Sequence, residues 1–241
     1  NAPQSRGLSQ NGFAGDHAPI GHPLIGTCTQ RSDSEQIFEN LLSEKSHWIL
    51  REHRIRGKGV LPGTAYLEMA RAALEQFRSE SKPVEIREIT FVSPLVVNDR
   101  EARNLRTTIT QHEDTFAFEI ASKAAGQNGS APQWVRHASG TMNYLDDAAR
   151  RTIDVQAIKD RCVERDLATL RRPGAQRNYG PRWQTMKEAY FGADEGFAVF
   201  ELPEEYAADL ESLPWHPALL DFPLSFLSAQ YLDQGTYLPF N

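Results

Sequence analysis

One histidine precedes a glycine-bearing turn and the expected start of a helix, an arrangement that suits proton transfer. The segment is His53-Arg-Ile-Arg-Gly57-Lys-Gly-Val-Leu-Pro62-Gly63. A helix start presents unpaired backbone N–H groups and a positive dipole, which stabilise an oxygen gaining negative charge. A neutral imidazole beside it can remove a proton. His53 also fits as an ordinary surface or half-buried histidine, with Gly57 and Pro62 as turn residues.

A carboxyl group lies inside an apolar run far along the chain. Asp221 stands in Leu219-Leu220-Asp221-Phe222-Pro223-Leu224, after His216. Partial burial among apolar side chains favours the neutral acid, so we expect Asp221 to donate a proton near neutral pH. A helix-capping role for Asp221, with Pro223 in the first turn, explains the same residue.

A turn with two aromatic residues lies between these segments, at Asn178-Tyr179-Gly180-Pro181-Arg182-Trp183. Large rings carry much apolar surface and commonly fill cores and pocket walls. We therefore expect Tyr179 and Trp183 to line the core or a pocket rather than to react.

Apolar periodicity predicts the elements that position these residues. Helical spacing predicts helices over residues 62–78 and 217–231, and Asp154 is a suitable N-cap for another. A short apolar stretch with Trp48 predicts a strand at residues 47–50. Alternating apolar residues predict further strands, around a turn-rich segment at 124–132, through residues 105–109, 116–120, 134–144 and 196–202. The sequence thus indicates an α+β fold.

The composition excludes several classes of protein. The 241 residues are 40% hydrophobic and 24% charged, values typical of a globular chain. A formal charge of −6 argues against a nucleic acid as the main partner. Cys28 and Cys162 lie far apart without CxxC spacing, which favours neither a disulfide framework nor a cysteine zinc site. No apolar run approaches bilayer length, so we expect a soluble, cytoplasmic protein.

Three ordered motifs resemble the dehydratase domains of modular polyketide synthases. They are His-x-x-x-Gly-x-x-x-x-Pro at 53–62, Tyr-Gly-Pro at 179–181 and His-Pro-Ala-Leu-Leu-Asp at 216–221. The resemblance implies a double hot-dog fold, in which two tandem halves each wrap a sheet around a central helix. We then expect a linker or arm over 1–20, the base-bearing half over 21–150 and the acid-bearing half over 151–241.

The resemblance also implies a reaction and its residues. A β-hydroxyacyl thioester, carried on the phosphopantetheine arm of an acyl carrier protein, would lose water to His53 as base and Asp221 as acid. No metal or redox cofactor is implied. The remaining residues are assigned to substrate binding: Gly57, Pro62, Gly63, Tyr179, Gly180, Pro181 and Ser225.

This chain departs from the family pattern in two places, and the first of them, Ser225, keeps other functions open. Related sequences carry Gln or His four residues after the acid, where this chain has the shorter Ser225. The family also continues with further strands beyond the position of Asn241, so the acid-bearing half looks incomplete. Double-bond isomerisation, ring closure by a hydroxyl, or an architectural role in branching remain alternatives to dehydration.

The expected partners are an acyl carrier protein and neighbouring synthase domains such as a ketosynthase, and a homodimer is left open. The stretch from Lys159 to Lys187 is rich in Lys and Arg, whereas residues 194–211 are acidic. A basic face on an acidic domain can steer an acidic partner, although a solvated helix face explains it equally.

Overall fold

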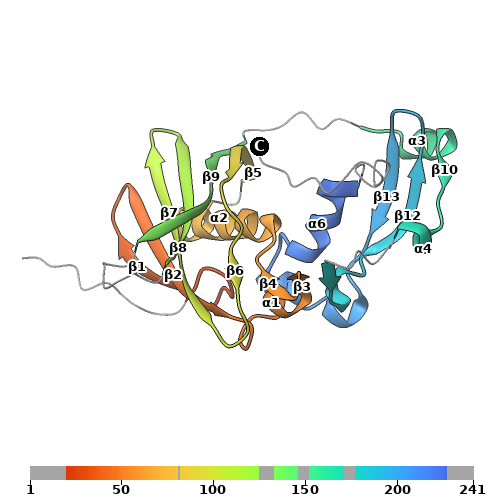
Figure 1. Cartoon of the computed structure of the whole chain (residues 1–241). Coiled ribbons are helices and arrows are strands. Elements are labelled where there is room, and N and C mark those ends of the chain that lie inside the picture. Colours follow the sequence, from red (N-terminus) through yellow and green to blue (C-terminus); the bar gives the residue numbers. More distant parts are fainter. Residues whose placement is uncertain (1–19, 81, 125–132, 146–151, 171–176, 227–241) are drawn as a thin grey trace, which may run out of the picture.

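A computed structural model describes residues 20–80, 82–124, 133–145, 152–170 and 177–226 (Figure 1). The expected arm at 1–20 and the turn-rich segment at 124–132 lie almost wholly outside the described residues, and helix 217–231 is described only in its first part. Within these ranges no helix is long and apolar enough to cross a membrane.

The central element of the larger lobe is helix α2 (Gly63–Phe77), as the helical spacing predicted. Pro62 caps it with extended backbone, and apolar residues on most of its surface are buried. A six-stranded antiparallel sheet curves around α2 (Figure 1). Its order is β1 (Thr27–Arg31), β2 (Glu35–Ser43), β7 (Ala102–His112), β8 (Thr115–Lys123), β9 (Trp134–Tyr144) and β5 (Val84–Phe91).

A second, four-stranded sheet joins distant parts of the chain. Its order is β11 (Arg177–Tyr179), β3 (His53–Ile55), β4 (Lys58–Val60) and β6 (Val96–Val97). The β3–β4 hairpin turns through Arg56 and Gly57, with φ of 51° and 75°. Two successive positive φ angles characterise a tight hairpin turn and favour glycine, which explains Gly57. Strand β11 pairs with β3 and sets Tyr179 opposite His53.

The second lobe holds a three-stranded sheet, ordered β10 (Val163–Glu164), β12 (Met186–Phe191) and β13 (Gly196–Phe200). Asp154 caps α3 as predicted, accepting a hydrogen bond from the Ala157 N–H at 3.0 Å. The helices here are α3 (Val155–Arg161), α4 (Leu167–Leu170), α5 (Asp209–Ser212) and α6 (Pro217–Ser225), with 3₁₀ turns η1 (Pro181–Trp183) and η2 (Glu204–Tyr206). Both lobes combine helices with antiparallel sheets, so the α+β prediction is confirmed.

The predicted strand at residues 47–50 is wrong, because this segment forms helix α1 (Trp48–Glu52). Ile49 and Leu50 are buried in the main core. The Trp48 ring stacks on His216, with centroids 5.3 Å apart. Helix α1, which the short apolar run did not predict, is therefore packed against His216, a residue far along the chain.

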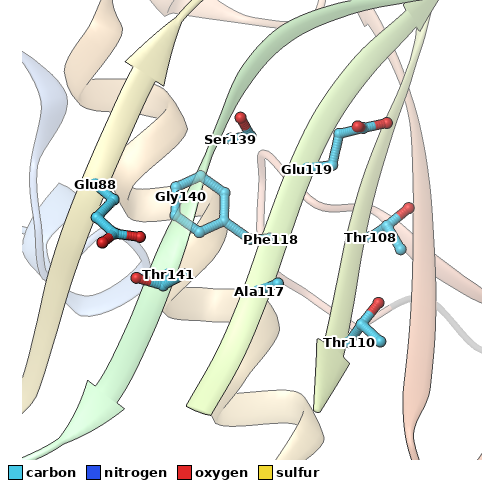
Figure 2. Close-up of a pocket in the computed structure, with 9 residues that line it drawn as sticks. All are labelled: Glu88, Thr108, Thr110, Ala117, Phe118, Glu119, Ser139, Gly140 and Thr141. Carbon is cyan, nitrogen blue, oxygen red and sulfur yellow. The ribbon is translucent and has the colours of Figure 1, made fainter. Parts of the chain in front are cut away.

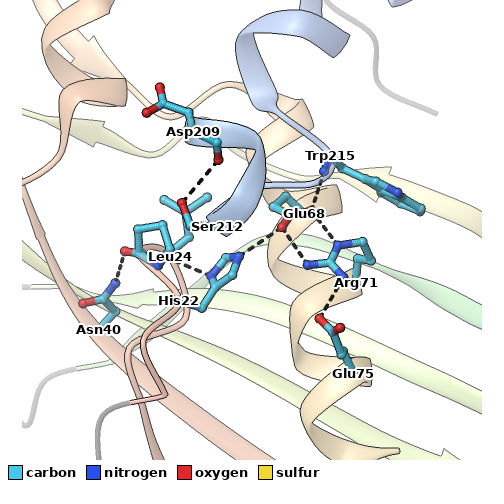
Figure 3. A network of polar contacts seen from close by, with 10 residues as sticks. His22, Leu24, Asn40, Glu68, Arg71, Glu75, Asp209, Ser212 and Trp215 are labelled. Atoms are coloured by element: carbon cyan, nitrogen blue, oxygen red, sulfur yellow. Dashed lines mark hydrogen bonds and ion pairs between the residues drawn. The ribbon is translucent and has the colours of Figure 1, made fainter. Parts of the chain in front are cut away.

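A buried carboxylate ties three parts of the chain together (Figure 3). Glu68, in the middle of α2, is fully buried and accepts hydrogen bonds from His22 Nε2 at 3.0 Å and from Arg71 Nε and Nη2. The Trp215 N–H, just before α6, donates to the same carboxylate at 3.1 Å. Hydrogen bonds from Arg71 and His22 hold the pKa of Glu68 below its usual value, although burial acts to raise it.

Candidate active site

His53 is buried where α1 ends and β3 begins. Its Nδ1 lies 2.7 Å from the Val60 carbonyl oxygen, across the β3–β4 hairpin. A carbonyl only accepts hydrogen bonds, so Nδ1 carries a proton, and Nε2 of the neutral ring is the basic nitrogen. The hairpin thus fixes the tautomer that a general base requires.

Asp221 approaches this nitrogen from α6. Asp221 Oδ2 lies 3.8 Å from His53 Nε2, and the aspartate side chain is 25% exposed. His216 caps α6, with its ring nitrogen accepting from the Leu219 N–H. Asp221 therefore stands in the second turn, and the helix-capping role considered from the sequence belongs to His216. Two motifs far apart in the sequence bring a base and an acid together.

Three aromatic rings surround the pair. The Tyr179 and Trp183 rings each have their centroids 5.3 Å from that of His53. Phe222 packs edge-on against Tyr179, at 5.4 Å between centroids. Trp183 is 2% exposed, and its Nε1–H donates to Asp221 Oδ2 at 3.0 Å. The rings give the acid and base an apolar surrounding.

The first turn of α2 meets the first turn of α6 beside this pair. The Thr64 hydroxyl donates to the Pro217 carbonyl at 2.9 Å. Pro62 is buried at the N-cap and Gly63 is the first helical residue, only a few residues beyond the Val60 carbonyl that holds His53. The positive end of the α2 dipole therefore lies on the same side of the molecule as the acid and base.

A charged cluster behind the aromatic rings fixes the elements that carry them. Arg182 in η1 donates to Glu52 at 2.5 Å and to Asp209 at 2.6 Å, and its guanidinium lies over the Trp48 ring. Fully buried His216 lies 3.6 Å from Asp209. Burial lowers the pKa of His216, although the Asp209 carboxylate acts in the opposite direction.

The other predicted binding residues occupy different positions. Gly180 donates its N–H to the Glu52 carbonyl at 2.7 Å, and a Cβ there would stand 2.3 Å from Glu52 Cγ, so only glycine fits. Gly57 and Pro181 are exposed in their turns, which supports a role in backbone shape. Contact of either residue with substrate stays a prediction. Ser225 ends α6, and its side chain lies outside the described residues.

Two surface depressions lie away from this site. Figure 2 shows one of about 340 Å³ on the six-stranded sheet, on the face turned away from α2; it is lined by threonines, a serine and the carboxylates of Glu88 and Glu119. Its lining contains no histidine and none of the site residues predicted from the sequence. The other, of about 670 Å³, is lined by Lys45, Arg51 and Arg100 together with Ser43, Glu44, Glu101 and Ala102.

Three side chains of the basic stretch predicted at residues 159–187 pair with carboxylates, whereas Arg165 and Lys187 form no ion pair with the described residues. Lys159 pairs with Glu188 at 2.6 Å, and Arg161 pairs with Glu195 at 2.6 Å. Arg182 belongs to the internal cluster with Glu52 and Asp209. Arg171 and Arg172 lie outside the described residues.

The sequence reasoning missed two groups that hold the acid and base. These are the Trp183 N–H on Asp221 and the Val60 carbonyl on His53. A signal existed for Trp183, because a buried indole N–H needs a hydrogen-bond acceptor. The sequence analysis assigned Trp183 only to the lining of a core or pocket and did not ask which group accepts from its N–H. No feature of the sequence indicates that the backbone carbonyl of Val60 accepts a hydrogen bond from His53.

Comparison with known proteins gives the same family across both lobes. The family described as polyketide synthase dehydratase domain matches residues 22–123, and that described as polyketide synthase dehydratase N-terminal domain matches residues 156–241. Polyketide synthase PksM of Bacillus subtilis is 26% identical over 91% of this chain. The pikromycin polyketide synthase component PikAII of Streptomyces venezuelae is 30% identical over 83% of it. This chain spans 5% of the length of each of these relatives.

Solved dehydratase domains share the fold. The domain from the CurK module of curacin polyketide synthase superposes with a TM-score of 0.79 at 27% identity, covering 91% of this chain and 79% of that one. The CurF domain gives 0.78 at 26% identity, covering 86% and 76%. CurK is also solved as two inactive mutants, histidine to phenylalanine and aspartate to asparagine, at positions about as far apart in sequence as His53 and Asp221. The motifs, the paired lobes and these likenesses establish that the chain belongs to the dehydratase domains of polyketide synthases and has their double hot-dog fold.

Proposed function

We propose that this domain removes water from a β-hydroxyacyl thioester to give the α,β-unsaturated thioester. The observation that carries the proposal is the 3.8 Å approach of His53 Nε2 and Asp221 Oδ2 inside an aromatic surround. A base and an acid this close can act on neighbouring carbon atoms of one substrate. The inactive His and Asp mutants of the CurK relative support these two residue types as the reacting pair.

The first half of the reaction is proton removal by His53. Its Nε2 takes a proton from the α-carbon, and the C–H electron pair becomes the new double bond. The Val60 carbonyl accepts from Nδ1–H and stabilises the imidazolium that forms. Amide groups in the first turn of α2, including Gly63, are proposed to donate to the thioester oxygen as charge develops there.

The second half is loss of the β-hydroxyl. Protonated Asp221 transfers its proton to that oxygen as the C–O bond breaks, and water leaves. Because Nε2 and Oδ2 are 3.8 Å apart, the proton and the hydroxyl must leave from one face of the substrate. His53 can then return its proton to Asp221, which restores both groups. Every step is a proton transfer or an elimination without change of oxidation state, so the reaction needs no redox cofactor, and in this proposal His53 and Asp221 carry it without a metal ion.

The substrate is proposed to arrive on an acyl carrier protein, with other polyketide synthase domains as neighbours. The relatives support this setting, since they are polyketide synthases. Lys45 and Arg100 form no ion pair with the described residues, and with Arg51 they line the larger depression. We therefore propose this depression, in addition to the 159–187 stretch, as a surface that attracts a carrier with acidic side chains.

Product mass tests the reaction. A β-hydroxyacyl carrier protein incubated with the domain should lose the mass of one water molecule. An unchanged mass with an altered product would indicate isomerisation or ring closure, and no change of any kind would support an architectural role. His53→Ala and Asp221→Asn should each reduce turnover by a factor of about 10²–10⁴.

A matched control separates chemistry from folding. His112, at the end of β7, is an exposed histidine remote in the fold from α6. His112→Ala should keep wild-type turnover, and all three variants should keep the thermal midpoint within a few degrees. An active His53→Ala enzyme would refute the proposed mechanism.

A further inference from the structure

A hydrogen bond that the proposed reaction does not use joins Trp183 to Asp221. Trp183 belongs to η1, whereas Asp221 belongs to α6, so the bond links two elements. The indole Nε1–H donates to Asp221 Oδ2 at 3.0 Å, and the Trp183 side chain is almost fully buried. A buried N–H that lost this acceptor would remain unsatisfied, so the geometry is strongly favoured.

The bond determines how the carboxyl group is presented. An indole N–H only donates, so Oδ2 acts as its acceptor, and this favours the proton of a neutral Asp221 on Oδ1 when the acid meets the substrate. Once that proton has left, the same N–H donates to a carboxylate, and a hydrogen bond to an ionised group is stronger than one to a neutral group. The contact therefore gains strength as the proposed reaction proceeds, which is the condition for lowering a barrier.

The indole is itself held in place. Its ring packs edge-on against Trp48 at 5.9 Å between centroids, and the backbone of η1 is tied to Glu52 through the Arg182 N–H at 2.9 Å. Glu52 immediately precedes His53. The donor that reaches the acid is thus anchored to the helix that ends at the base.

Position 225 gives an independent way to examine this bond. Ser225 lies four residues after Asp221 on α6, so residues 221 and 225 share one face of the helix. A serine side chain is short, whereas a glutamine at this position carries an N–H₂ donor about one turn away, within reach of the aspartate.

We propose that the Trp183 indole N–H is the positioning group for Asp221, holding the carboxyl in its proton-donating orientation from outside α6. This proposal rests on the proposed dehydration. It assigns a positioning role to Trp183, which the sequence analysis expected only to line the core or a pocket. It predicts that the N–H, and not only the ring, is required.

Trp183→Phe removes the N–H and keeps an aromatic ring. The kcat for dehydration should fall about 10- to 100-fold, as expected for loss of a hydrogen bond to a charged group, while KM stays within a factor of about 2. The double variant Trp183→Phe/Ser225→Gln should have a kcat at least about tenfold higher than that of Trp183→Phe alone. Trp134→Phe, the same change on β9, should leave kcat unaltered.

Two outcomes would overturn the proposal. One is wild-type kcat in Trp183→Phe. The other is a folded Trp183→Phe enzyme whose loss is untouched by Ser225→Gln and appears equally in kcat and KM, because that pattern belongs to a ring that only fills space.

A spectroscopic readout tests the bond without relying on turnover. In ¹⁵N-labelled protein, the indole N–H signal absent from Trp183→Phe identifies Trp183, and Asp221→Asn should shift that signal more than those of the other tryptophans. An unshifted Trp183 signal would refute the bond. A wild-type domain that shows the shift yet releases no water would instead refute the proposed dehydration.

Discussion

Replacing Glu68 with Gln should destabilise the protein by about 3–5 kcal/mol, the cost typical of breaking a buried charged pair. The contacts of this carboxylate lead to a similar figure. Its two oxygens accept from His22, from Arg71 twice and from the Trp215 N–H. A Gln side chain turns one oxygen into an N–H₂ group that faces two donors, so two hydrogen bonds to a charged group are lost, at about 1.5–3 kcal/mol each.

Thermal and chemical unfolding would measure the effect. For a chain of this size roughly 2–4 °C of midpoint corresponds to 1 kcal/mol, so the midpoint should fall by about 6–20 °C. Glu75→Gln is the matched control, because Glu75 pairs with the same Arg71 at 2.9 Å but its side chain is 62% exposed. Its replacement should cost less than about 1 kcal/mol. Equal losses of stability in Glu68→Gln and Glu75→Gln would refute the idea that the buried Glu68 carboxylate holds these parts of the chain together.

The pH dependence of this difference has a defined sign. Hydrogen bonds from Arg71 and His22, acting against burial, hold the pKa of Glu68 below its ordinary value in the folded protein. The stabilisation is therefore complete above the pKa of the unfolded chain, about 4.3, and is lost as pH falls through the lower folded value. Wild type and Glu68→Gln should converge in stability only in acid.

Three further predictions follow from contacts already described. Gly180→Ala should lower the thermal midpoint by several degrees and reduce turnover, because its Cβ would stand 2.3 Å from Glu52 Cγ; a fully stable, active variant would contradict this close approach. Since burial lowers the pKa of His216, stability should fall as pH drops below about 6.5, and His216→Gln should reduce that slope in urea titrations; an unchanged slope would exclude His216 as its source. Charge reversal at Lys45 and Arg100 should slow turnover of carrier-bound substrate at low salt and spare a small soluble thioester; equal effects on both substrates would exclude docking at this depression.

The elements that could be predicted from the sequence are those with a long periodic pattern. Helix α2 and strand β9 follow the predicted spans closely, because each presents one repeating apolar face. Helix α1 and strand β11 are too short for a pattern to emerge: α1 has 5 residues and β11 has 3. Their structure depends on distant partners, Trp48 on His216 and Tyr179 on His53.

The candidate site divides in a similar way. His53 and Asp221 were chosen through family motifs, since one histidine near a helix start and one aspartate in an apolar run are each weak signals by themselves. The sequence alone did not give the distance in space between the His53 and Asp221 side chains. Capping of α6 by His216 also escaped prediction, because a histidine ring is an unusual cap and Asp221 offered a commoner one.

The pairing of β11 with β3 has a consequence for how the chain folds as it is made. Strand β3 lies between β4 and β11, and Arg182, which follows β11, contacts Glu52 across 130 positions of sequence. A ribosome adds about 5–20 residues each second, so one edge of β3 waits on the order of ten seconds for its partner strand. An open strand edge can pair with another chain during that interval. Arg54 on β3 pairs with Glu44 and Asp99, both of which are made before β11, so these ion pairs can hold β3 in place while its edge is still open.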